Sequence, residues 1–470
     1  MERSFSLSIG GQSVPGDRGT FAVINPATGE SFAECPAATP DQVNQAVAAA
    51  GVAFHSWQHL ADGERQAMLE AIAGKIEANS EELATLVTLE QGKPLDVARF
   101  EVGAAVAWTR ATAALAIPVK VIEDSAHKLI ELHHRPVGVV GSITPWNWPL
   151  MIAVWHIMPA LRSGNTVVIK PSSLTPFNTL RLVELINEVV PPGVANCVTG
   201  EGGTGRAITA NPGVQKVVFT GSTPTGQDIM RAAADNLKRL TLELGGNDAG
   251  IVLPDADPAV VAPKLFQSAF LNMGQTCAAL KRLYVHESQY DDLCERLAQI
   301  AREQKIGPGL EAGVTFGPVQ NPEQLALVEA LVEDARQQGA KVLCGGARLN
   351  GSGYFYPPTI VAGLSNGVRL VDEEQFGPVL PVIPYADVED ALRMANDNPN
   401  GLGGSVWGKD LTRARALAQR LECGTAWING HGEVLPHCPF GGHKMSGFGV
   451  EFGEEGLLEY TNPQLVHVCK

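Results

Sequence analysis

The 470-residue chain lacks the features that mark several classes of protein. Its 50 acidic residues outnumber 35 lysines and arginines, a net charge of −15, so nucleic-acid binding, which needs basic patches, is not expected. Its eight cysteines include no Cys-x-x-Cys pair, which argues against a zinc site or a disulfide framework. The longest apolar run, 150–161, contains His156 and is too short to span a bilayer, and no signal segment opens the chain. These absences predict a cytoplasmic protein with no metal and no membrane partner.

The composition is that of a large globular protein. Hydrophobic residues make up 45% of the chain and charged residues 18%, and the length exceeds that of one ordinary domain, so we expect two or three domains. The 50 glycines and 31 prolines are dispersed, which is typical of many tight turns rather than of a low-complexity tract.

The N-terminal part combines short strands, helices and a hairpin. Residues 1–40 carry turn signals and a candidate strand at 31–37, and residues 41–115 have apolar side chains at three- and four-residue steps, which predicts helices. Residues 117–135 instead suggest two strands around a polar turn at 123–125. Because such a hairpin has few core partners of its own, it packs either on another subunit or on the surface of this chain, and the pattern leaves both readings open.

From residue 138 onward strands and helices alternate. Apolar strands separated by helices are typical of a parallel sheet covered on both faces, the architecture of a doubly wound, Rossmann-like nucleotide-binding domain. The predicted strands of this first α/β domain are 138–144, 165–170, 194–200, 215–220 and 239–244. The pattern then repeats in a second α/β domain, with predicted strands near 249–253, 282–286, 342–344, 379–385, 405–408 and 425–429.

Cys277 lies near the start of the second domain. It follows Gly274, Gln275 and Thr276, which suit a turn, and it precedes a candidate strand at 280–286. A cysteine at such a junction can face a cleft and ionise, whereas one in an apolar run usually does not. Most free cysteines are small buried packing groups, so Cys277 alone does not establish a catalytic site.

Two glycine-rich loops follow predicted strands and open predicted helices. Residues 200–205 match G-x-G-x-x-G, which is a weak pattern in a chain with 50 glycines. Residues 219–226, Phe-Thr-Gly-Ser-Thr-Pro-Thr-Gly, place backbone N–H groups and the Ser222 hydroxyl at a helix start, where an anion is favoured. Either loop can equally be a turn without a ligand, and local chemistry does not separate the two.

Seven motifs spread along the chain occur together in one order. They are Thr144-Pro-Trp-Asn-Trp-Pro149, Lys170-Pro-Ser, Phe219-Thr-Gly-Ser222, Leu242-Glu-Leu-Gly-Gly246, Gly274-Gln-Thr-Cys277, Glu374-Gln-Phe-Gly-Pro378 and Pro439-Phe-Gly-Gly-His-Lys-Met-Ser-Gly447. The set resembles the NAD(P)-dependent aldehyde dehydrogenase superfamily over essentially the whole chain. One such motif is modest evidence, but seven in order are highly specific.

The resemblance implies three structural parts. Residues 1–116 and 137–246 are expected to form the cofactor-binding domain, and residues 247–447 the catalytic domain. Residues 117–136 and 448–470 are expected to form a small β oligomerisation element. The expected assembly is a homodimer or a homotetramer.

The resemblance also implies a reaction, the oxidation of an aldehyde to its carboxylic acid. A nucleophile must add to the carbonyl carbon, donors must hold the oxyanion, a cofactor must accept hydride, and a base must activate the water that hydrolyses the thioester. Cys277 is the expected nucleophile, since a thiolate is the strongest one available at neutral pH. The Asn147 side chain and the Cys277 backbone N–H are expected to hold the oxyanion, with Glu243 as base. Without the resemblance, Glu243 reads as a salt-bridge partner and Asn147 as a turn-capping amide.

The cofactor site follows from the same resemblance, with NAD or NADP as the expected cofactor. Lys170 is expected to bind the adenosine ribose, and Gly221 and Ser222 to contact the pyrophosphate. Glu374 is expected to hold the nicotinamide ribose, and Phe376 to pack beside the ring. In this family the usual glycine fingerprint does not bind the nucleotide, so the first glycine-rich loop is expected to be a structural turn. The remaining members of the expected cofactor site are Thr144, Trp146 and Ser173.

The chain departs from the family pattern at Ser173. NAD-preferring members often carry a glutamate three residues after the lysine, where it binds both ribose hydroxyls, and here that position is a serine. A carboxylate repels the 2′-phosphate of NADP and a serine does not, so we expect NADP to be tolerated and even preferred.

The resemblance places Trp148, Ile152, Trp155, Phe440 and the loop 430–438 around the substrate tunnel. This wall is apolar and aromatic and contains no arginine to anchor a second carboxylate, so it suits an uncharged aliphatic or aromatic aldehyde. The tryptophans can instead form a cation–π box for a quaternary ammonium aldehyde, or pack as core residues. The pattern leaves open the roles of three loop residues, His431, His437 and Cys438.

Two alternatives remain. A CoA-acylating enzyme of the same superfamily releases the thioester to a thiol, but such members tend to lack the glutamate base, which is present here as Glu243. A non-catalytic binding protein keeps the fold without turnover, but drift is expected to erode at least one member of the set of nucleophile, oxyanion donor, base and cofactor residues.

Overall fold

The predicted apolar strands of the first α/β unit form the centre of an eight-stranded sheet. The computed structural model describes residues 4–470. The strand order is β2-β1-β9-β8-β7-β10-β11-β21, and the strands from β9 to β11 run parallel. Their bounds are β1 Leu7–Ile9, β2 Gln12–Val14, β7 Val139–Ile143, β8 Thr166–Lys170, β9 Ala195–Cys197, β10 Lys216–Thr220, β11 Arg239–Glu243 and β21 Gly447–Phe448.

Helices cover both faces of this sheet, which explains why its strands are apolar throughout. On β8, Val167 and Ile169 join a core built mainly with α2 to α6, whereas Val168 joins a core with α1, α7 and α8. Successive side chains point to opposite faces of a strand, so both must be buried. The helices are α1 Pro40–Trp57, α2 Asp62–Ala78, α3 Ser80–Gln91, α4 Leu95–Ala114, α5 Pro149–Arg162, α6 Phe177–Asn187, α7 Gly202–Ala210 and α8 Thr223–Ala233.

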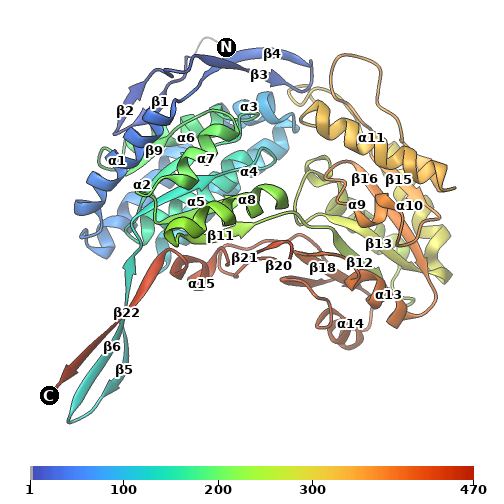
Figure 1. Cartoon of the computed structure of the whole chain (residues 1–470). Coiled ribbons are helices and arrows are strands. Elements are labelled where there is room, and N and C mark those ends of the chain that lie inside the picture. The colour runs from blue at the N-terminus through green and yellow to red at the C-terminus, as the bar shows by residue number, and fades with distance from the viewer. Residues whose placement is uncertain (1–3) are drawn as a thin grey trace.

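A second body follows along the chain (Figure 1). Its seven-stranded sheet has the order β14-β15-β16-β13-β12-β18-β19 and is parallel except for β14. The strands are β12 Asp248–Val252, β13 Leu280–His286, β14 Lys341–Cys344, β15 Thr359–Ala362, β16 Val379–Tyr385, β18 Gly403–Trp407 and β19 Thr425–Ile428. The helices are α9 Pro258–Phe270, α10 Tyr290–Arg302, α11 Pro322–Gln337, α12 Arg369–Asp372, α13 Val388–Asn396 and α14 Leu411–Ala418. Neighbouring residues Leu283 and Tyr284 of β13 enter different cores, so this sheet is also covered on both faces.

A three-stranded sheet projects from the first body and carries the C-terminus near its tip (Figure 1). It consists of β5 Lys120–Asp124, β6 Lys128–Pro136 and β22 Thr461–Cys469, and β22 pairs antiparallel with the whole of β6. Within the segment expected to join this sheet, α15 Gly453–Leu458 instead packs against α5, and β21 pairs with β11.

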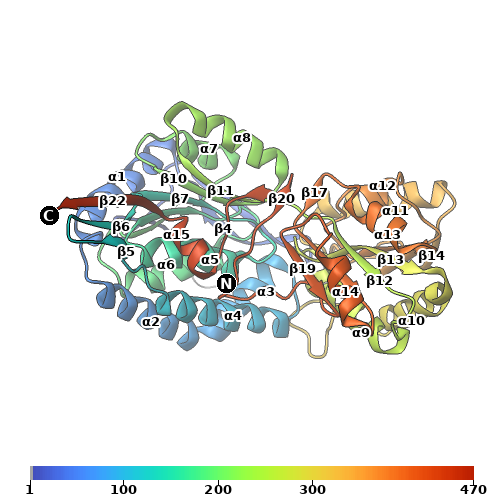
Figure 2. The same ribbon diagram turned by 90° about the horizontal axis from the view of Figure 1, so that it is seen from below.

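The two bodies lie side by side, and smaller elements complete them (Figure 2). Two short antiparallel pairs are β3 Thr20–Asn25 with β4 Glu30–Pro36, and β17 Asn400–Gly401 with β20 His443–Lys444. Three short 3₁₀ helices are η1 Ala234–Asn236, η2 Leu271–Gly274 and η3 Glu287–Gln289. Across residues 4–470, no helix combines the length and the apolar character that crossing a bilayer requires.

The α/β fold class is confirmed, and the errors of the sequence prediction are local. The polar turn predicted at 123–125 is wrong, because Glu123 and Asp124 belong to β5. The backbone N–H of Ser125 donates to the carbonyl of Lys128 at 2.9 Å, which closes the turn slightly later. Strand β15 was missed because its four residues are too few to show a period.

Candidate active site

A cavity of about 240 Å³ lies where the two bodies meet. One wall comes from the loops that follow β7, β10 and β11, and the other from the turn before β13, one side of α11 and the loop after α12. Ligands of doubly wound sheets bind at the carboxyl ends of such strands. Of the predicted site residues, those that line this cavity together are Trp146, Asn147, Gly221, Ser222, Cys277, Glu374 and Phe376.

The turn that carries Cys277 has an unusual backbone. Residues 272–274 have positive φ values of 54°, 55° and 70°, and such strain in non-glycine residues costs of order 1–3 kcal/mol each. A Cβ atom on Gly274 would lie 2.3 Å from the carbonyl oxygen of Gly377, so only glycine fits where this turn touches the loop that carries Phe376. This conformation places the half-buried Cys277 on the cavity wall.

The Cys277 thiol has acidic surroundings. Burial raises its pKa to about 12, with further contributions from the carboxyl groups of Glu243, Glu374 and Asp248. The thiol is therefore protonated at neutral pH in the ligand-free site, and a base or a local positive charge must act before the sulfur can attack. A position at a turn does not by itself make this cysteine a thiolate.

Asn147 faces the same turn from the first body. Its side-chain Nδ2 donates to the carbonyl of Gln275 at 3.0 Å, two residues before Cys277. Its own carbonyl accepts hydrogen bonds from Lys93 Nζ at 2.9 Å and from Asn272 Nδ2 at 2.8 Å. Since the amide bonds to a segment distant in the sequence, it does not act as a cap of its own turn.

An ion pair next to Asn147 was not evident from the sequence. Lys93 Nζ lies 2.6 Å from Glu101 Oε2, and both side chains are completely buried. The other Glu101 oxygen accepts the backbone N–H groups of Leu150 and Met151 at 3.0 and 3.1 Å, which satisfies free donors at the start of α5. Burial lowers the pKa of Lys93 to about 8, and Glu101 opposes that shift. Both Glu101 oxygens and the Lys93 ammonium therefore have partners. Through these bonds the pair fixes the start of α5, the helix that follows Asn147.

Glu243 ends β11 and is only 4% exposed. Neither of its carboxylate oxygens has a hydrogen-bond partner among residues 4–470, which argues against a structural salt bridge. Burial, and then the carboxylate of Glu451, raise its pKa well above the usual value. A buried carboxyl group with a raised pKa and two unused oxygens is suited to exchanging a proton with water.

Glu451 belongs to a buried polar group near Glu243. Its Oε1 lies 3.2 Å from His156 Nε2, within ion-pair distance but without the alignment of a hydrogen bond. The His156 ring nitrogens bond to Ser142 Oγ at 2.9 Å and to Thr220 Oγ1 at 3.0 Å. His156, which in the sequence only interrupts an apolar run, is thus a hydrogen-bonded core histidine.

The phosphate-binding prediction falls on the start of α8. Gly221 and Ser222 line the cavity directly before this helix, and a Cβ atom on Gly221 would lie 2.4 Å from the Phe219 ring. The Ser222 hydroxyl donates to Thr225 at 3.0 Å and does not cap the helix, so the first N–H groups stay available for an anion. The other glycine-rich loop, 200–205, does not line this cavity.

Three further residues predicted for the cofactor site lie outside the lining of this cavity. Lys170 ends β8, where its Nζ donates to the carbonyl of Pro171 at 2.6 Å, and burial lowers its pKa to about 8. Thr144 Oγ1 is buried without a hydrogen-bond partner in the described chain. Ser173 is half-buried in the loop that follows β8.

Glu374 and Phe376 sit together on the second body's wall. Glu374 Oε1 accepts the N–H of Gly246 at 3.1 Å, and burial raises its pKa to about 8 against the opposing charge of Lys281. Phe376 has a positive φ of 43° and packs edge-to-face on Trp146, with ring centroids 5.4 Å apart. A non-glycine residue held in this conformation on a cavity wall is typical of a ligand site.

The predicted substrate residues gather beside Cys277, outside the lining of the larger cavity. Trp148, Trp155 and Phe440 are members of one apolar cluster that packs against Cys277. Two aromatic residues of this cluster were not evident from the sequence: the ring centre of Phe452 lies 4.7 Å from that of Trp155, and the ring centre of Trp108 lies 5.7 Å from it. The other buried members are Ala104, Met151, Ile152, Ala278 and Leu402.

Trp148 has protein partners on its face and at its edge. Its Nε1 donates to Thr276 Oγ1 at 2.9 Å, next to Cys277, and Lys93 Nζ lies 3.7 Å from the centre of its ring. The side chain is buried, with 3% exposure. A protein cation already occupies this ring, so Trp148 is a poor member of a cation–π box for a ligand.

The loop 430–438 has one buried histidine. His431 Nδ1 bonds to Ser405 Oγ at 2.9 Å, and its Nε2 lies 3.4 Å from Asp248 Oδ2. His437 and Cys438 are exposed. His431 therefore ties the loop to the second sheet, and the other two side chains face solvent.

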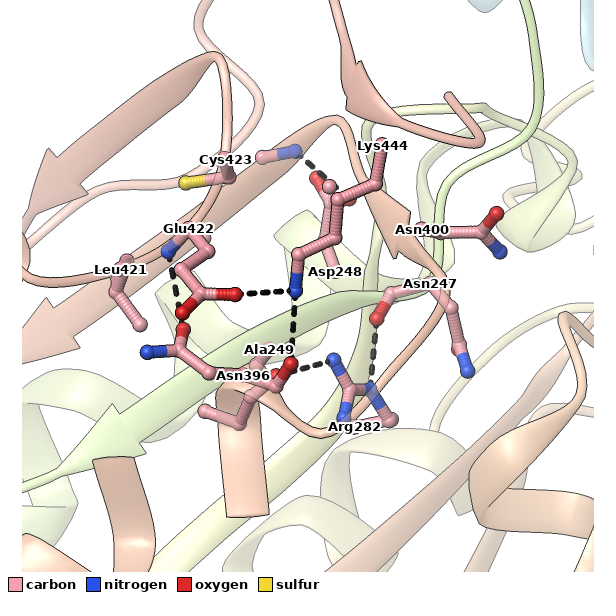
Figure 3. Close-up of a pocket in the computed structure, with 14 residues that line it drawn as sticks. Asn247, Asp248, Ala249, Arg282, Asn396, Asn400, Leu421, Glu422, Cys423 and Lys444 are labelled. Carbon is pink, nitrogen blue, oxygen red and sulfur yellow. Dashed lines mark hydrogen bonds and ion pairs between the residues drawn. The ribbon is translucent and has the colours of Figure 1, made fainter. Parts of the chain in front are cut away.

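A second, much smaller cavity of about 10 Å³ lies beside β12 (Figure 3). Its basic side chains already have partners: Lys444 Nζ lies 2.6 Å from Glu422, and Arg282 donates to the backbone carbonyls of Asn247 and Ala395 at 2.7 and 2.9 Å. This volume suffices for about one water molecule. The side chains around this cavity connect segments of the second body by polar contacts, and the cavity is too small for a substrate.

A doubly wound sheet that faces a second α/β body across a cleft, with a cysteine, an amide and an unpaired glutamate at the junction, defines a dehydrogenase-type enzyme. The model of the aldehyde dehydrogenase family matches residues 14–466. Phenylacetaldehyde dehydrogenase of Pseudomonas fluorescens is 41% identical over 474 residues, which cover 97% of this chain and 94% of the relative. The chain belongs to the aldehyde dehydrogenase family, as the seven motifs predicted.

Solved structures agree with this assignment. The NAD+ complex of an aldehyde dehydrogenase from Bacillus cereus matches with a TM-score of 0.97 at 37% identity, over 99% of this chain and 97% of that one. An NADP-dependent enzyme from E. coli matches with a TM-score of 0.97 at 36% identity, over 99% and 98% of the two chains. The predicted enzyme class, an NAD(P)-dependent aldehyde dehydrogenase, is therefore confirmed at the level of the family.

Proposed function

We propose that this protein oxidises an aldehyde to the carboxylic acid with NAD or NADP through a covalent intermediate on Cys277. The observation that carries this proposal is the meeting of Cys277, Asn147 and Glu374 in one cleft, with Glu243 facing the thiol. Nucleophile, oxyanion donor and proton acceptor are thus present around one position.

The first step is the addition of Cys277 to the aldehyde. The thiol gives up its proton to solvent water and the sulfur attacks the carbonyl carbon, which becomes tetrahedral. One N–H of the Asn147 amide is held by Gln275, and the second is free to donate to the oxyanion together with the Cys277 backbone N–H. The bound nicotinamide supplies the chemistry of the oxidation by accepting a hydride, which leaves a thioester on Cys277.

The second step is hydrolysis of the thioester. Glu243 removes a proton from a water molecule, the resulting hydroxide attacks the thioester carbon, and the acid leaves as the C–S bond breaks. The unpaired oxygens and raised pKa of Glu243 support this role, because a base works best when its pKa is close to the working pH.

The residues present fit a dinucleotide. The uncapped start of α8 suits the pyrophosphate, the orphaned Thr144 hydroxyl can donate to the cofactor, and Glu374 and Lys170 suit the two riboses. Phe376 and Trp146 form an aromatic pair on the same wall.

We infer that NADP is accepted, because no carboxylate stands at Ser173. The similar structures include both an NAD+ complex and an NADP-dependent enzyme, so this position can differ within the fold. Replacing Ser173→Glu should raise the KM for NADP about tenfold or more while leaving the KM for NAD within a few-fold, by charge repulsion with the 2′-phosphate. If wild type and Ser173→Glu have the same ratio of the KM for NADP to the KM for NAD, residues other than Ser173 set the cofactor preference.

The substrate we propose is an uncharged aromatic or aliphatic aldehyde. Aromatic side chains of Trp155, Phe452 and Phe440 pack together beside Cys277, and Lys93 already covers Trp148. The related phenylacetaldehyde dehydrogenase is named for an aromatic aldehyde of this kind. A panel that compares phenylacetaldehyde, hexanal and betaine aldehyde tests this, and the highest kcat/KM for betaine aldehyde would contradict it.

Hydrolysis is favoured over transfer of the acyl group to CoA because Glu243 is present and has no other partner. Adding CoA should leave the product a free acid, and formation of acyl-CoA would support the rival reaction. A non-catalytic protein of this fold would bind nucleotide but form no reduced cofactor with any aldehyde.

We propose that the three-stranded sheet and residues near it mediate homo-oligomerisation of a cytoplasmic enzyme. Exposed apolar side chains gather there: Val119, Val121, Ile122, Leu465 and Val468. Such a patch on a projecting sheet suits contact with a second copy. Light scattering should give a mass of two or four chains, and Val121→Glu combined with Leu465→Glu should lower it. A monomeric wild-type protein would contradict the proposal.

A further inference from the structure

Lys281 is a buried cation beside the active site. The proposed reaction gives this side chain no role. It lies in β13, four positions after Cys277, and is 1% exposed. Its ammonium donates to the Gly274 carbonyl, and it lies 5.5 Å from the centre of the Phe376 ring. One side chain therefore touches the turn that carries the nucleophile and the loop that carries Glu374.

The titratable groups that face Lys281 are acidic. Glu374 is the strongest of them, followed by Asp248 and the Cys277 thiol, and all three favour the charged ammonium. Burial opposes them and lowers the pKa of Lys281 to about 8. In return, Lys281 opposes the effect of burial on the pKa of Glu374. Behind these acids, the further titratable groups are Glu243, which faces the thiol, and His431, which faces Asp248.

Lys281 differs in its bonding from the other buried lysine of the site. Lys93 makes a 2.6 Å ion pair with Glu101, whereas no carboxylate hydrogen bond involves Lys281 among residues 4–470. A buried ammonium without a directly paired carboxylate is costly to the fold. Lys281 lies among three acidic groups, two of which, Glu374 and Cys277, line the cavity. A buried charge in this position is typical of a functional site.

We propose that Lys281 is a positioning residue that joins the nucleophile turn to the cofactor loop and favours the ionised forms of Cys277 and Glu374 together. This inference rests on the proposed role of Cys277 as nucleophile. A positive charge a short distance from a thiol lowers the free energy of the thiolate, and the same charge keeps Glu374 as an acceptor for a ribose hydroxyl. Holding the Gly274 carbonyl fixes where the sulfur sits.

The experiment measures the alkylation of Cys277 by iodoacetamide as a function of pH in the full-length, ligand-free enzyme. The Cys277 peptide is quantified by mass spectrometry, and the KM for NAD and for NADP is measured in parallel. The variants are Lys281→Met and Lys281→Arg. The matched control is Lys216→Met, because Lys216 is also a buried lysine whose pKa burial lowers to about 8, but it lies in β10 and bonds to Thr241.

In Lys281→Met, the rate of Cys277 alkylation at pH 7, where Lys281 carries its charge, should fall about tenfold relative to wild type, and this difference should shrink as the pH rises above about 8. The KM for the cofactor should rise several-fold in the same variant. Lys281→Arg should keep an alkylation rate near that of wild type at pH 7, and Lys216→Met should match wild type in both measurements.

A folded Lys281→Met with the wild-type alkylation rate at pH 7 and the wild-type cofactor KM would overturn the proposal, as would equal losses of rate in the Met and Arg variants. If Lys281→Met does not fold, the ratio of the alkylation rates of Lys281→Arg and wild type decides. Lysine loses its charge as the pH rises through about 8 and arginine does not, so this ratio should increase from neutral to alkaline pH. A constant ratio would contradict the proposal. A wild-type enzyme that keeps its turnover after Cys277 is alkylated would instead refute the nucleophile assignment.

Discussion

Two buried groups of charges meet at Cys277, and they differ in how completely they are bonded. Around Asn147, the Lys93–Glu101 pair spans 2.6 Å, and both Glu101 oxygens have partners. Around the thiol, Glu243 has no hydrogen-bond partner in the described chain, and the pKa of Cys277 is raised to about 12. Charges with matched partners hold a structure, whereas unmatched ones are available for proton transfer. In the proposed mechanism the first group is therefore a scaffold and the second the reacting part.

Of the variants that test this comparison, Glu243→Gln is expected to lower turnover the most. Without the base, the thioester should accumulate, and steady-state turnover should fall roughly 10²- to 10⁴-fold, while one equivalent of reduced cofactor still forms rapidly. Stopped-flow absorbance of the reduced nicotinamide measures both phases. Unchanged steady-state turnover would show that another group activates the water.

Asn147→Ala removes the proposed oxyanion donor. We expect a loss of roughly 10²- to 10³-fold in kcat, about 3–4 kcal/mol of transition-state stabilisation. Steady-state kinetics with one good aldehyde measures this loss. Asn147→Asp keeps the shape but replaces the donor by an acceptor, so activity as high as wild type in that variant would contradict the role.

Lys93→Met tests the scaffold. Removing one partner leaves the Glu101 carboxylate buried and unpaired, which should cost about 3–5 kcal/mol of stability. The exposed pair of Lys75 and Glu188 has the same 2.6 Å separation, and Lys75→Met should cost only about 0–1 kcal/mol. Thermal unfolding followed by circular dichroism compares the two variants. Equal shifts in Tm would mean that burial of the pair does not matter.

Glu243→Gln also has a predicted effect on stability that depends on pH. The folded-state pKa of Glu243 lies well above its ordinary value of 4.5, so its contribution to stability is present at acid pH and is lost as the pH rises through the folded-state value. Glutamine has no proton to lose. The free energy of unfolding of the variant should therefore gain on that of wild type from about pH 4.5 upward, by about 1.4 kcal/mol per unit of pKa difference, which is seen as a relative rise in Tm. Parallel Tm curves would contradict the raised pKa.

The sequence predicted the parts of the fold that depend on local pattern. Apolar strands between helices specified both parallel sheets, and motif order specified which loops gather at the cleft. The missed residues Lys93, Glu101 and Lys281 become adjacent only through tertiary packing. Lys93 and Glu101 lie eight positions apart on either side of the start of α4, which no helical spacing would pair. A lysine in an apolar strand, as at Lys281, was the one available signal.

The electrostatic state of the site was equally beyond the sequence. A turn before Cys277 predicted exposure, but the thiol pKa depends on Glu243, Glu374 and Asp248, which three different segments supply. The environment of Trp148 could not be predicted from the sequence either, because its aromatic residue type alone suggested contact with a ligand. Its partners Lys93 and Thr276 are visible only in the structure.

The most direct test of the account is turnover of Cys277→Ala beside wild type, followed by absorbance of the reduced nicotinamide with a panel of aldehydes and with NAD and NADP in parallel. The account predicts that wild type turns over and that the variant forms no reduced cofactor with any aldehyde while it still binds the nucleotide. Equal activity of the two proteins would show that Cys277 is not the nucleophile.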